Sequence, residues 1–122
     1  MTRIRFEFGA LTLDAELFAT PTAQAIAAAL PISSSALTWG EEVYFETPVK
    51  AKLEPDAKQV VDPGTVCFWT QGDALALPFG RTPISTDARP KLANPCNVLG
   101  SIADFASLKK IKAGDKVRVE KA

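Results

Sequence analysis

VVDPGTVCFWTQGDALALPFGRTPIS, residues Val60–Ser85, is the stretch that decides the fold. It contains two apolar runs, Thr65–Trp69 and Ala74–Phe79, on either side of a short polar link that includes Gly72. A short glycine-centred link between two β-rich runs predicts a hairpin. The segment 62–64 (DPG) supplies the entry turn, because proline presets φ and glycine tolerates positive φ. We therefore expect this hairpin to be the centre of a small β-barrel, with the polar loop that follows it on the rim.

Both ends of the chain show the same strand periodicity. Thr2–Phe8 alternates bulky apolar residues with Arg3, Arg5 and Glu7, which is typical of a half-buried strand. Leu11–Leu17 continues the alternation after a Gly-Ala turn, so the first two strands are expected to form a meander. Further strands are predicted at Leu37–Trp39, Glu42–Thr47, Cys96–Ile102 and around Val117–Val119.

One clear helix is predicted near the N-terminal third. Thr20 is a suitable cap and Pro21 a suitable first helical residue, and Pro31 ends the helix because the residue before a proline is pushed out of helical geometry. Four apolar residues then fall at helical spacing on one stripe: Ala23, Ile26, Ala27 and Leu30. A second, short helix is expected at Ala103–Lys110.

Two segments are predicted to be irregular. Val49–Lys58 is polar and contains a proline, with at most a short strand around Ala51–Leu53. Gly80–Pro95 contains three prolines and is expected to be a long loop, which in a small domain is usually functional or mobile.

Composition limits the classes of function. The 122 residues, 1–122, suffice for a single domain, and a hydrophobic content of 47% builds a core without a metal or disulfide. Basic and acidic residues number 14 each, so no overall field favours nucleic acid or an anionic membrane. No apolar run approaches transmembrane length and the start of the sequence does not resemble a signal peptide, so a cytoplasmic location is expected. No cofactor is indicated, and the oligomeric state is left open.

The chain contains no histidine. This absence excludes Ser-His-Asp and Cys-His catalysis and every imidazole metal ligand. The two cysteines, Cys67 and Cys96, are expected to be reduced thiols in a cytosolic protein, and Cys67 sits in an apolar run where it acts as a small hydrophobic residue.

Several segments, taken in order, resemble the cyclophilins. Ala19–Gln24 resembles the start of the first cyclophilin helix, Ala-Pro-Lys-Thr-Ala-Glu, with the proline displaced by one position. Gly64–Trp69 resembles the Gly-x-Leu-Ser-Met-Ala strand, Ala74–Phe79 stands where that family has Ser-Gln-Phe-Phe-Ile, and Asn97–Ile102 resembles Val-Val-Phe-Gly-Lys-Val. The resemblance extends over nearly the whole chain.

The closer resemblance is to a prokaryotic cyclophilin-like family of unknown function. Its Gly-Glu-x-Tyr-Phe strand is matched by Gly40–Phe45 with one extra residue, its Phe-Gly-x-Thr-Pro-x-Ser loop by Phe79–Ser85, and its Asn-Val-x-Gly strand by Asn97–Gly100. At position 81 that family commonly has a proline, whereas this chain has Arg81. The resemblance implies a closed antiparallel cyclophilin-like β-barrel of about eight strands, capped by two helices.

The residues of cyclophilin catalysis are not matched. The resemblance places Thr47 where cyclophilins have the arginine of a Phe-His-Arg strand, and Cys96 where they have the active-site histidine. A threonine hydroxyl is a much weaker electrostatic donor than a guanidinium. Peptidyl-prolyl isomerase activity is therefore expected to be feeble.

Seven residues are candidate ligand contacts. Trp69 corresponds to a position facing the cyclophilin groove. Two interpretations are open for Trp69 and for Phe79: the side chain forms a wall for a ligand, or it serves packing. Arg81 is either a clamp for a carboxylate or carbonyl, or a solvated charge at the rim. Thr82 and Ser85 are short polar groups of the same loop, and loop capping explains them adequately. Asn97, which is not one of these seven candidates, is a third short polar group expected near the rim.

The remaining two candidates, Glu42 and Tyr44, lie on one strand. Glu42 shares its strand face with Glu46, and with Glu41 these carboxylates suit acid–base chemistry or a hard cation. The simpler interpretation is a solvated face, because Val43 and the following phenylalanine occupy the other side. Tyr44 shares the glutamate side and would add a hydroxyl donor.

Three functions remain open at this stage. The first is a binding domain that holds a peptide or small-molecule ligand in an outer groove. The second is a weak prolyl isomerase, and the third is an enzyme of another class that uses the Glu, Tyr and Arg groups. Because small barrels fill their interior with side chains, any site is expected on the outside, between Tyr44, Trp69 and the loop Phe79–Ser85.

Overall fold

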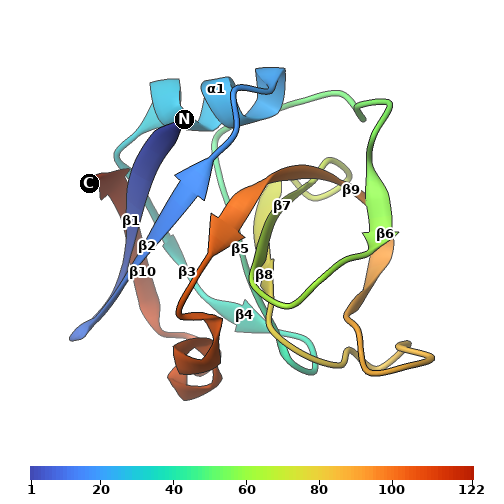
Figure 1. The fold of residues 1–122 in the computed structure, drawn as a ribbon. Coiled ribbons are helices and arrows are strands. Elements are labelled where there is room, and N and C mark those ends of the chain that lie inside the picture. Colours follow the sequence, from blue (N-terminus) through green and yellow to red (C-terminus); the bar gives the residue numbers. More distant parts are fainter.

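Ten strands and two short helices build the protein, which we describe from a computed structural model covering residues 1–122 (Figure 1). The strands are β1 (Thr2–Phe8), β2 (Leu11–Leu17), β3 (Ile32–Ser35), β4 (Leu37–Thr38), β5 (Glu42–Glu46), β6 (Lys58–Val60), β7 (Thr65–Trp69), β8 (Ala74–Pro78), β9 (Lys91–Ile102) and β10 (Lys116–Lys121). The helices are α1 (Pro21–Ala29) and the 3₁₀ helix η1 (Phe105–Lys110).

The strands form one curled antiparallel sheet in the order β3-β10-β1-β2-β9-β7-β8-β5-β4, with β6 paired to β9. The expected closed barrel is wrong, because no ladder joins the two end strands. β3 and β4 follow each other in the chain with only Ala36 between them, whereas an antiparallel pair needs a reversing turn of about two residues. The backbone N–H of Ala36 instead donates to the carbonyl of Asp115 (2.7 Å), and its carbonyl accepts from Gly114 N–H (2.8 Å).

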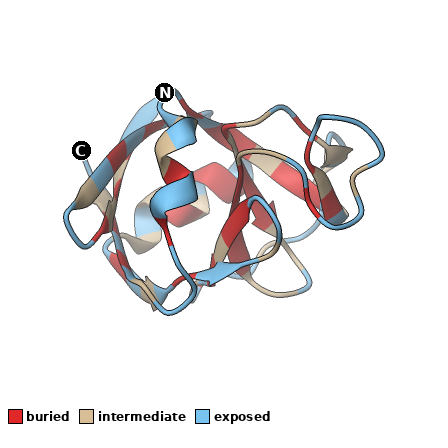
Figure 2. Cartoon of the chain, turned by 90° about the horizontal axis from the view of Figure 1, so that it is seen from below, coloured by how far each residue is buried: buried red, intermediate tan, exposed pale blue.

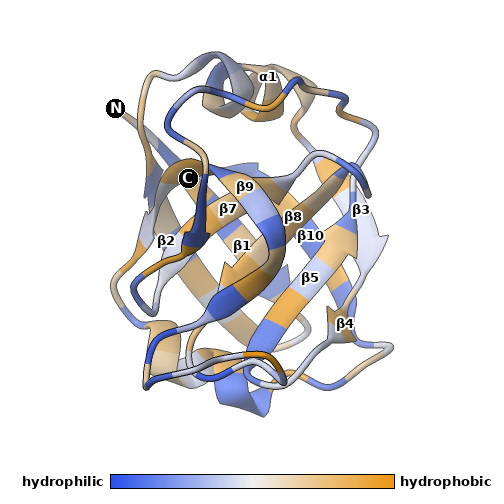
Figure 3. Cartoon of the chain, turned by 90° about the vertical axis from the view of Figure 1, so that its right-hand side faces the viewer, coloured by the Kyte–Doolittle hydropathy of each residue, from blue (hydrophilic) through white to orange (hydrophobic).

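The strands that alternate most clearly in sequence are paired as predicted. β1 pairs with β2 and β10, and the side chains of Ile4, Phe6 and Phe8 are buried. On the outer face, Arg5 forms an ion pair with Asp14 directly opposite it (2.8 Å). Figure 3 shows this alternation of hydrophobic and hydrophilic residues along several strands. The predicted hairpin is also confirmed, since β7 and β8 pair with Trp69 opposite Ala74.

The helix α1 covers one end of the curled sheet (Figures 1 and 3). Thr20 caps it, with the side-chain oxygen accepting from Ala23 N–H (3.3 Å), and Pro21 begins it, as predicted. Ala23 and Ile26 are buried against the core. The second predicted helix is a 3₁₀ helix, and only Leu108 of it is fully buried. Neither helix has the length or the apolar composition that crossing a membrane requires.

The predicted loop Gly80–Pro95 is shorter than expected, because its last residues belong to β9. That strand starts at Lys91 and contains twelve residues. Its first half pairs only with β6, through a register shift in which Val60 faces Lys91 and Lys58 faces Cys96. Pro95 lies within this irregular stretch, where a missing N–H leaves no ladder bond broken. The possible strand around Ala51–Leu53 is not formed.

Two groups of buried apolar side chains lie on opposite faces of the sheet. The larger group of 23 residues fills the inside of the curl, and Figure 2 shows buried segments along the strands with exposed turns at their ends. A smaller group lies on the outer face where β9 and β6 fold over β7 and β8; its members are Val61, Cys67, Ala76, Leu92 and Cys96. This second group positions the cavity described next.

Candidate ligand cavity on the outer face

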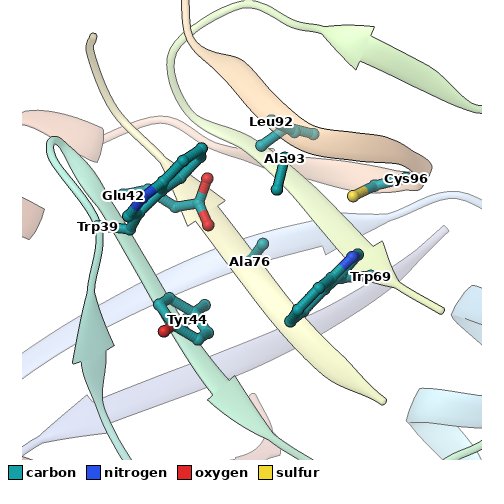
Figure 4. Close-up of a pocket in the computed structure, with 8 residues that line it drawn as sticks. All are labelled: Trp39, Glu42, Tyr44, Trp69, Ala76, Leu92, Ala93 and Cys96. Carbon is teal, nitrogen blue, oxygen red and sulfur yellow. The ribbon is translucent and has the colours of Figure 1, made fainter. Parts of the chain in front are cut away.

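A cavity of about 240 Å³ opens on the outer face of the sheet, next to the smaller apolar group (Figure 4). Seven of its eight lining side chains are apolar or aromatic. The lining residues are Trp39, Glu42, Tyr44, Trp69, Ala76, Leu92, Ala93 and Cys96. They come from β5, β7, β8, β9 and the turn between β4 and β5.

The strand period places Glu42 and Tyr44 in the cavity. Alternate residues of a strand point to the same face, so these two project outward while Val43 and Phe45 enter the main core. Tyr44 is opposite Ala76 on β8, and the small side chain of Ala76 leaves room for the cavity floor.

Two aromatic side chains form perpendicular walls. The rings of Tyr44 and Trp69 have centroids 6.5 Å apart and planes at 88°, an edge-to-face arrangement. The indole N–H of Trp69 donates to Oδ1 of Asn94 (3.1 Å), which ties the ring to β9. Gly72 leaves space for that ring, because a Cβ at this position would be 2.4 Å from it.

A third aromatic wall is Trp39, which is half-buried in the turn before β5. Its backbone N–H donates to the carbonyl of Glu42 (3.0 Å), so the turn holds both residues beside the cavity. The turn needs Gly40, which has φ +59° and packs so closely on the backbone of Arg81 that a Cβ would be 2.9 Å from its carbonyl oxygen.

The only acidic group of the cavity is Glu42, and it is 7% exposed. Its carboxylate points toward the middle of the cavity (Figure 4). The Oε1 atom is buried and has no hydrogen-bond partner. Burial therefore raises the pKa of this carboxyl from 4.5 to about 7, because no donor offsets the loss of solvation.

The interpretation of a solvated glutamate face is thus wrong for Glu42, although it holds for the exposed Glu46 on the same face. The difference is tertiary, because β9 supplies Leu92 and Cys96 near Glu42 and nothing comparable near Glu46. Glu41 is exposed and accepts a bond from the backbone N–H of Arg81 (3.2 Å). No set of three acidic or thiol groups converges in a way that could hold a metal ion.

Both cysteines lie in the smaller apolar group as free thiols. Cys96 faces the cavity, and burial together with the charge of Glu42 raises its pKa to about 12. Burial also raises the pKa of Cys67, with further contributions from Cys96 and Glu42. At neutral pH both thiols are therefore protonated and uncharged.

Three of the seven predicted ligand contacts, Glu42, Tyr44 and Trp69, meet in the cavity, and the other four lie outside its lining. Phe79 packs against the main core. Arg81 is exposed and donates to the carbonyl of Ser85 (3.4 Å). A ligand contact by these two residues stays a prediction.

Thr82 and Ser85 fasten the loop to the start of β9. The Thr82 hydroxyl donates to the carbonyl of Lys91. The Ser85 oxygen accepts from the backbone N–H groups of Thr82 (2.9 Å) and Lys91 (3.1 Å) and donates to the carbonyl of Arg89 (2.9 Å). These contacts agree with the loop-capping interpretation of both residues.

Asn97 is fully buried and is not the rim residue that was expected. Its amide nitrogen donates to Thr22 Oγ1 and to the carbonyl of Lys52 (both 2.9 Å), and its oxygen accepts from Glu54 N–H (2.7 Å). Asn97 therefore joins β9, α1 and the irregular segment before β6. A polar residue at the centre of a strand gives no indication of such distant partners.

Sequence reasoning missed five cavity residues: Trp39, Ala76, Leu92, Ala93 and Cys96. One signal was present for Trp39, because it is one of only two tryptophans and lies three residues before Glu42. The resemblance to cyclophilins gave a signal for Cys96, which falls at an active-site position there. Leu92 and Ala93 were assigned to a loop, so nothing indicated their position over β7 and β8.

Comparison with known proteins identifies relatives of the fold. The family model described as Cyclophilin-like matches residues 2–120. A hypothetical protein from Archaeoglobus fulgidus, solved in solution, is 43% identical with a TM-score of 0.83, over 99% of this chain and 95% of that one. McbB, solved in complex with tryptophan, is 19% identical with a TM-score of 0.69, over 97% of this chain and 44% of McbB. No curated protein sequence matches the chain.

Proposed function

The chain belongs to the cyclophilin-like family, and we propose that it binds a small molecule with an apolar, aromatic body in the outer cavity. The observation that carries this proposal is a cavity with seven apolar or aromatic lining residues and a single inward-facing carboxyl group. Ligand sites are typically concave and mostly apolar, with a few polar groups that orient the ligand. The cavity has this composition.

The volume of the cavity supports a small molecule rather than an extended peptide. An engineered apolar cavity of about 150 Å³ in another protein accommodates benzene. The volume of about 240 Å³ found here therefore suits one ring with a short side chain, or two fused rings. The tryptophan named with McbB contains two fused rings, although the low identity between the two chains relates them by fold alone.

Binding can be followed directly at the two tryptophans. Trp39 and Trp69 are the only tryptophans of the chain and both line the cavity. In a ¹⁵N-correlated NMR titration with one- and two-ring aromatic fragments, we expect both indole N–H signals to shift together and to saturate. Fragments that shift neither signal at millimolar concentration would contradict the proposal.

A substitution at the mouth of the cavity tests the location. Ala93 is exposed and lines the opening, so Ala93→Phe should fill it and weaken fragment binding at least tenfold. Ala88→Phe, at an exposed loop position outside the lining, is the matched control and should bind normally. Equal binding by wild type and Ala93→Phe would place the site elsewhere.

Prolyl isomerisation has less support. In the sequence resemblance, Thr47 stands where cyclophilins have their catalytic arginine. The Thr47 hydroxyl donates to the carbonyl of Asp73 (2.9 Å) and accepts from Val49 N–H (3.1 Å). We expect a protease-coupled peptide assay to show a rate more than tenfold below that of an ordinary cyclophilin. A rate within tenfold would contradict this, because only about 1.4 kcal/mol would then separate the two barriers.

The enzyme alternative based on Glu, Tyr and Arg groups has less support, because Arg81 lies outside the cavity that holds Glu42 and Tyr44. We also propose that the protein works in the cytoplasm without a nucleic-acid or membrane partner. The zero net charge and the two free thiols support this proposal.

A further inference from the structure

We infer that the ligand of the cavity carries a protonated amine next to its apolar body, and that the carboxylate of Glu42 and the surrounding aromatic rings hold this amine. The inference rests on the proposed function and specifies the chemical class of the ligand. It starts from Glu42, whose carboxylate points into the cavity and whose buried Oε1 atom has no hydrogen-bond partner.

No group of the protein satisfies or neutralises that oxygen. On its own strand Glu42 is accompanied in the cavity by Tyr44, and the neighbouring strand β8 supplies only Ala76 to the lining and Pro78 opposite Glu42. The titratable groups nearby on β7 and β9 are the thiols of Cys67 and Cys96, both uncharged at neutral pH. The lining contains no lysine or arginine. A buried acceptor without a donor is costly, so a donor supplied by the ligand is strongly favoured.

The aromatic lining favours a cationic donor over a neutral one. Trp39, Tyr44 and Trp69 surround the space in front of the carboxylate (Figure 4). The face of an aromatic ring attracts an ammonium group, and the attraction increases when water is excluded. An ammonium group would therefore meet an opposite charge and aromatic rings in one place, whereas a ligand carboxylate would meet a like charge without a compensating cation.

The three compounds 2-phenylethylamine, 2-phenylethanol and 3-phenylpropanoate test the inference with the same ring and a cationic, neutral or anionic end. Calorimetric titration at pH 8 should show the amine binding at least tenfold more tightly than the alcohol, with the carboxylate weakest. Between pH 8 and pH 6 the amine should lose about five- to tenfold in affinity, because it stays protonated while a carboxyl with a pKa of about 7 becomes mostly neutral. The alcohol should change little.

Glu42→Gln is the matched variant, since it keeps the shape of the side chain and removes the charge. It should reduce the preference for the amine over the alcohol to within about twofold and abolish its pH dependence. Ala93→Phe should weaken all three compounds.

Two kinds of failure are distinguishable. If amine and alcohol bind equally to the wild type, and Ala93→Phe weakens both, the cavity is a ligand site but the amine inference is overturned. If the carboxylate binds best, the inference is also overturned. If none of the three compounds binds although other one- or two-ring fragments do, the amine inference is overturned. If those fragments do not bind either, or Ala93→Phe has no effect on the compounds that bind, the proposed function itself fails, and the inference fails with it.

Discussion

Glu42→Gln is expected to become more stable relative to the wild type as the pH rises, by about 3 kcal/mol between pH 4 and pH 8. The pKa of Glu42 is raised in the folded protein from 4.5 to about 7, because the carboxyl is buried without a donor. The folded state therefore keeps a proton that the unfolded chain releases between these two pH values. The stability of the wild type therefore decreases between pH 4.5 and pH 7. Above pH 7 it is lowered by the full free-energy cost of ionising the buried carboxyl.

Urea denaturation of both proteins at several pH values measures this effect. The difference between their free energies of unfolding should grow from pH 5 to pH 8, since glutamine does not titrate. Glu46→Gln is the control on the same strand, because it makes the same substitution at an exposed position outside the cavity lining. A Glu42→Gln difference that is independent of pH would show that the carboxyl is not desolvated in solution.

Gly100→Ala is expected to destabilise the protein by about 3 kcal/mol or more and to lower its Tm by more than about 10 °C. A Cβ at this position would be 1.9 Å from the carbonyl oxygen of Glu16 on β2, where β2 pairs with the end of β9. That atom belongs to the backbone, so it cannot rotate away as a side chain could. The two strands would have to separate.

Thermal unfolding followed by circular dichroism measures the loss. Ser101→Ala is the control, because Ser101 is exposed and occupies the next position of β9. It should change Tm by no more than about 2 °C. A Gly100→Ala protein with a Tm as close to wild type as that control would show that β2 and β9 do not approach each other as closely as described.

Local patterns predicted a large part of the fold. The alternation in β1, the hairpin of β7 and β8, and the cap and proline of α1 are all signals carried by residues close together in sequence. Such signals depend on side-chain periodicity and turn conformation, which residues close together in the chain specify. The candidate site was predicted in part for the same reason, since Tyr44 and Glu42 were assigned to one strand face.

The errors concern long-range contacts. The first half of β9 was predicted to be a loop because Pro90 precedes it and Pro95 lies within it. This half nevertheless pairs with β6, through an irregular register. Closure of the barrel was predicted both from the alternating strands with their glycine and proline turns and from the resemblance. The path of the chain through Ala36 keeps the two end strands unpaired.

By itself, the sequence determined that this is a mainly β protein without histidine chemistry, and that Glu42 and Tyr44 share a face. Only the tertiary structure decided what covers that face. The placement of Leu92 and Cys96 over β7 and β8 turns an ordinary surface glutamate into a buried carboxyl with a raised pKa. The reason is physical: periodicity specifies the direction of a side chain, but its solvation depends on segments far away in the sequence, here about 50 residues along the chain.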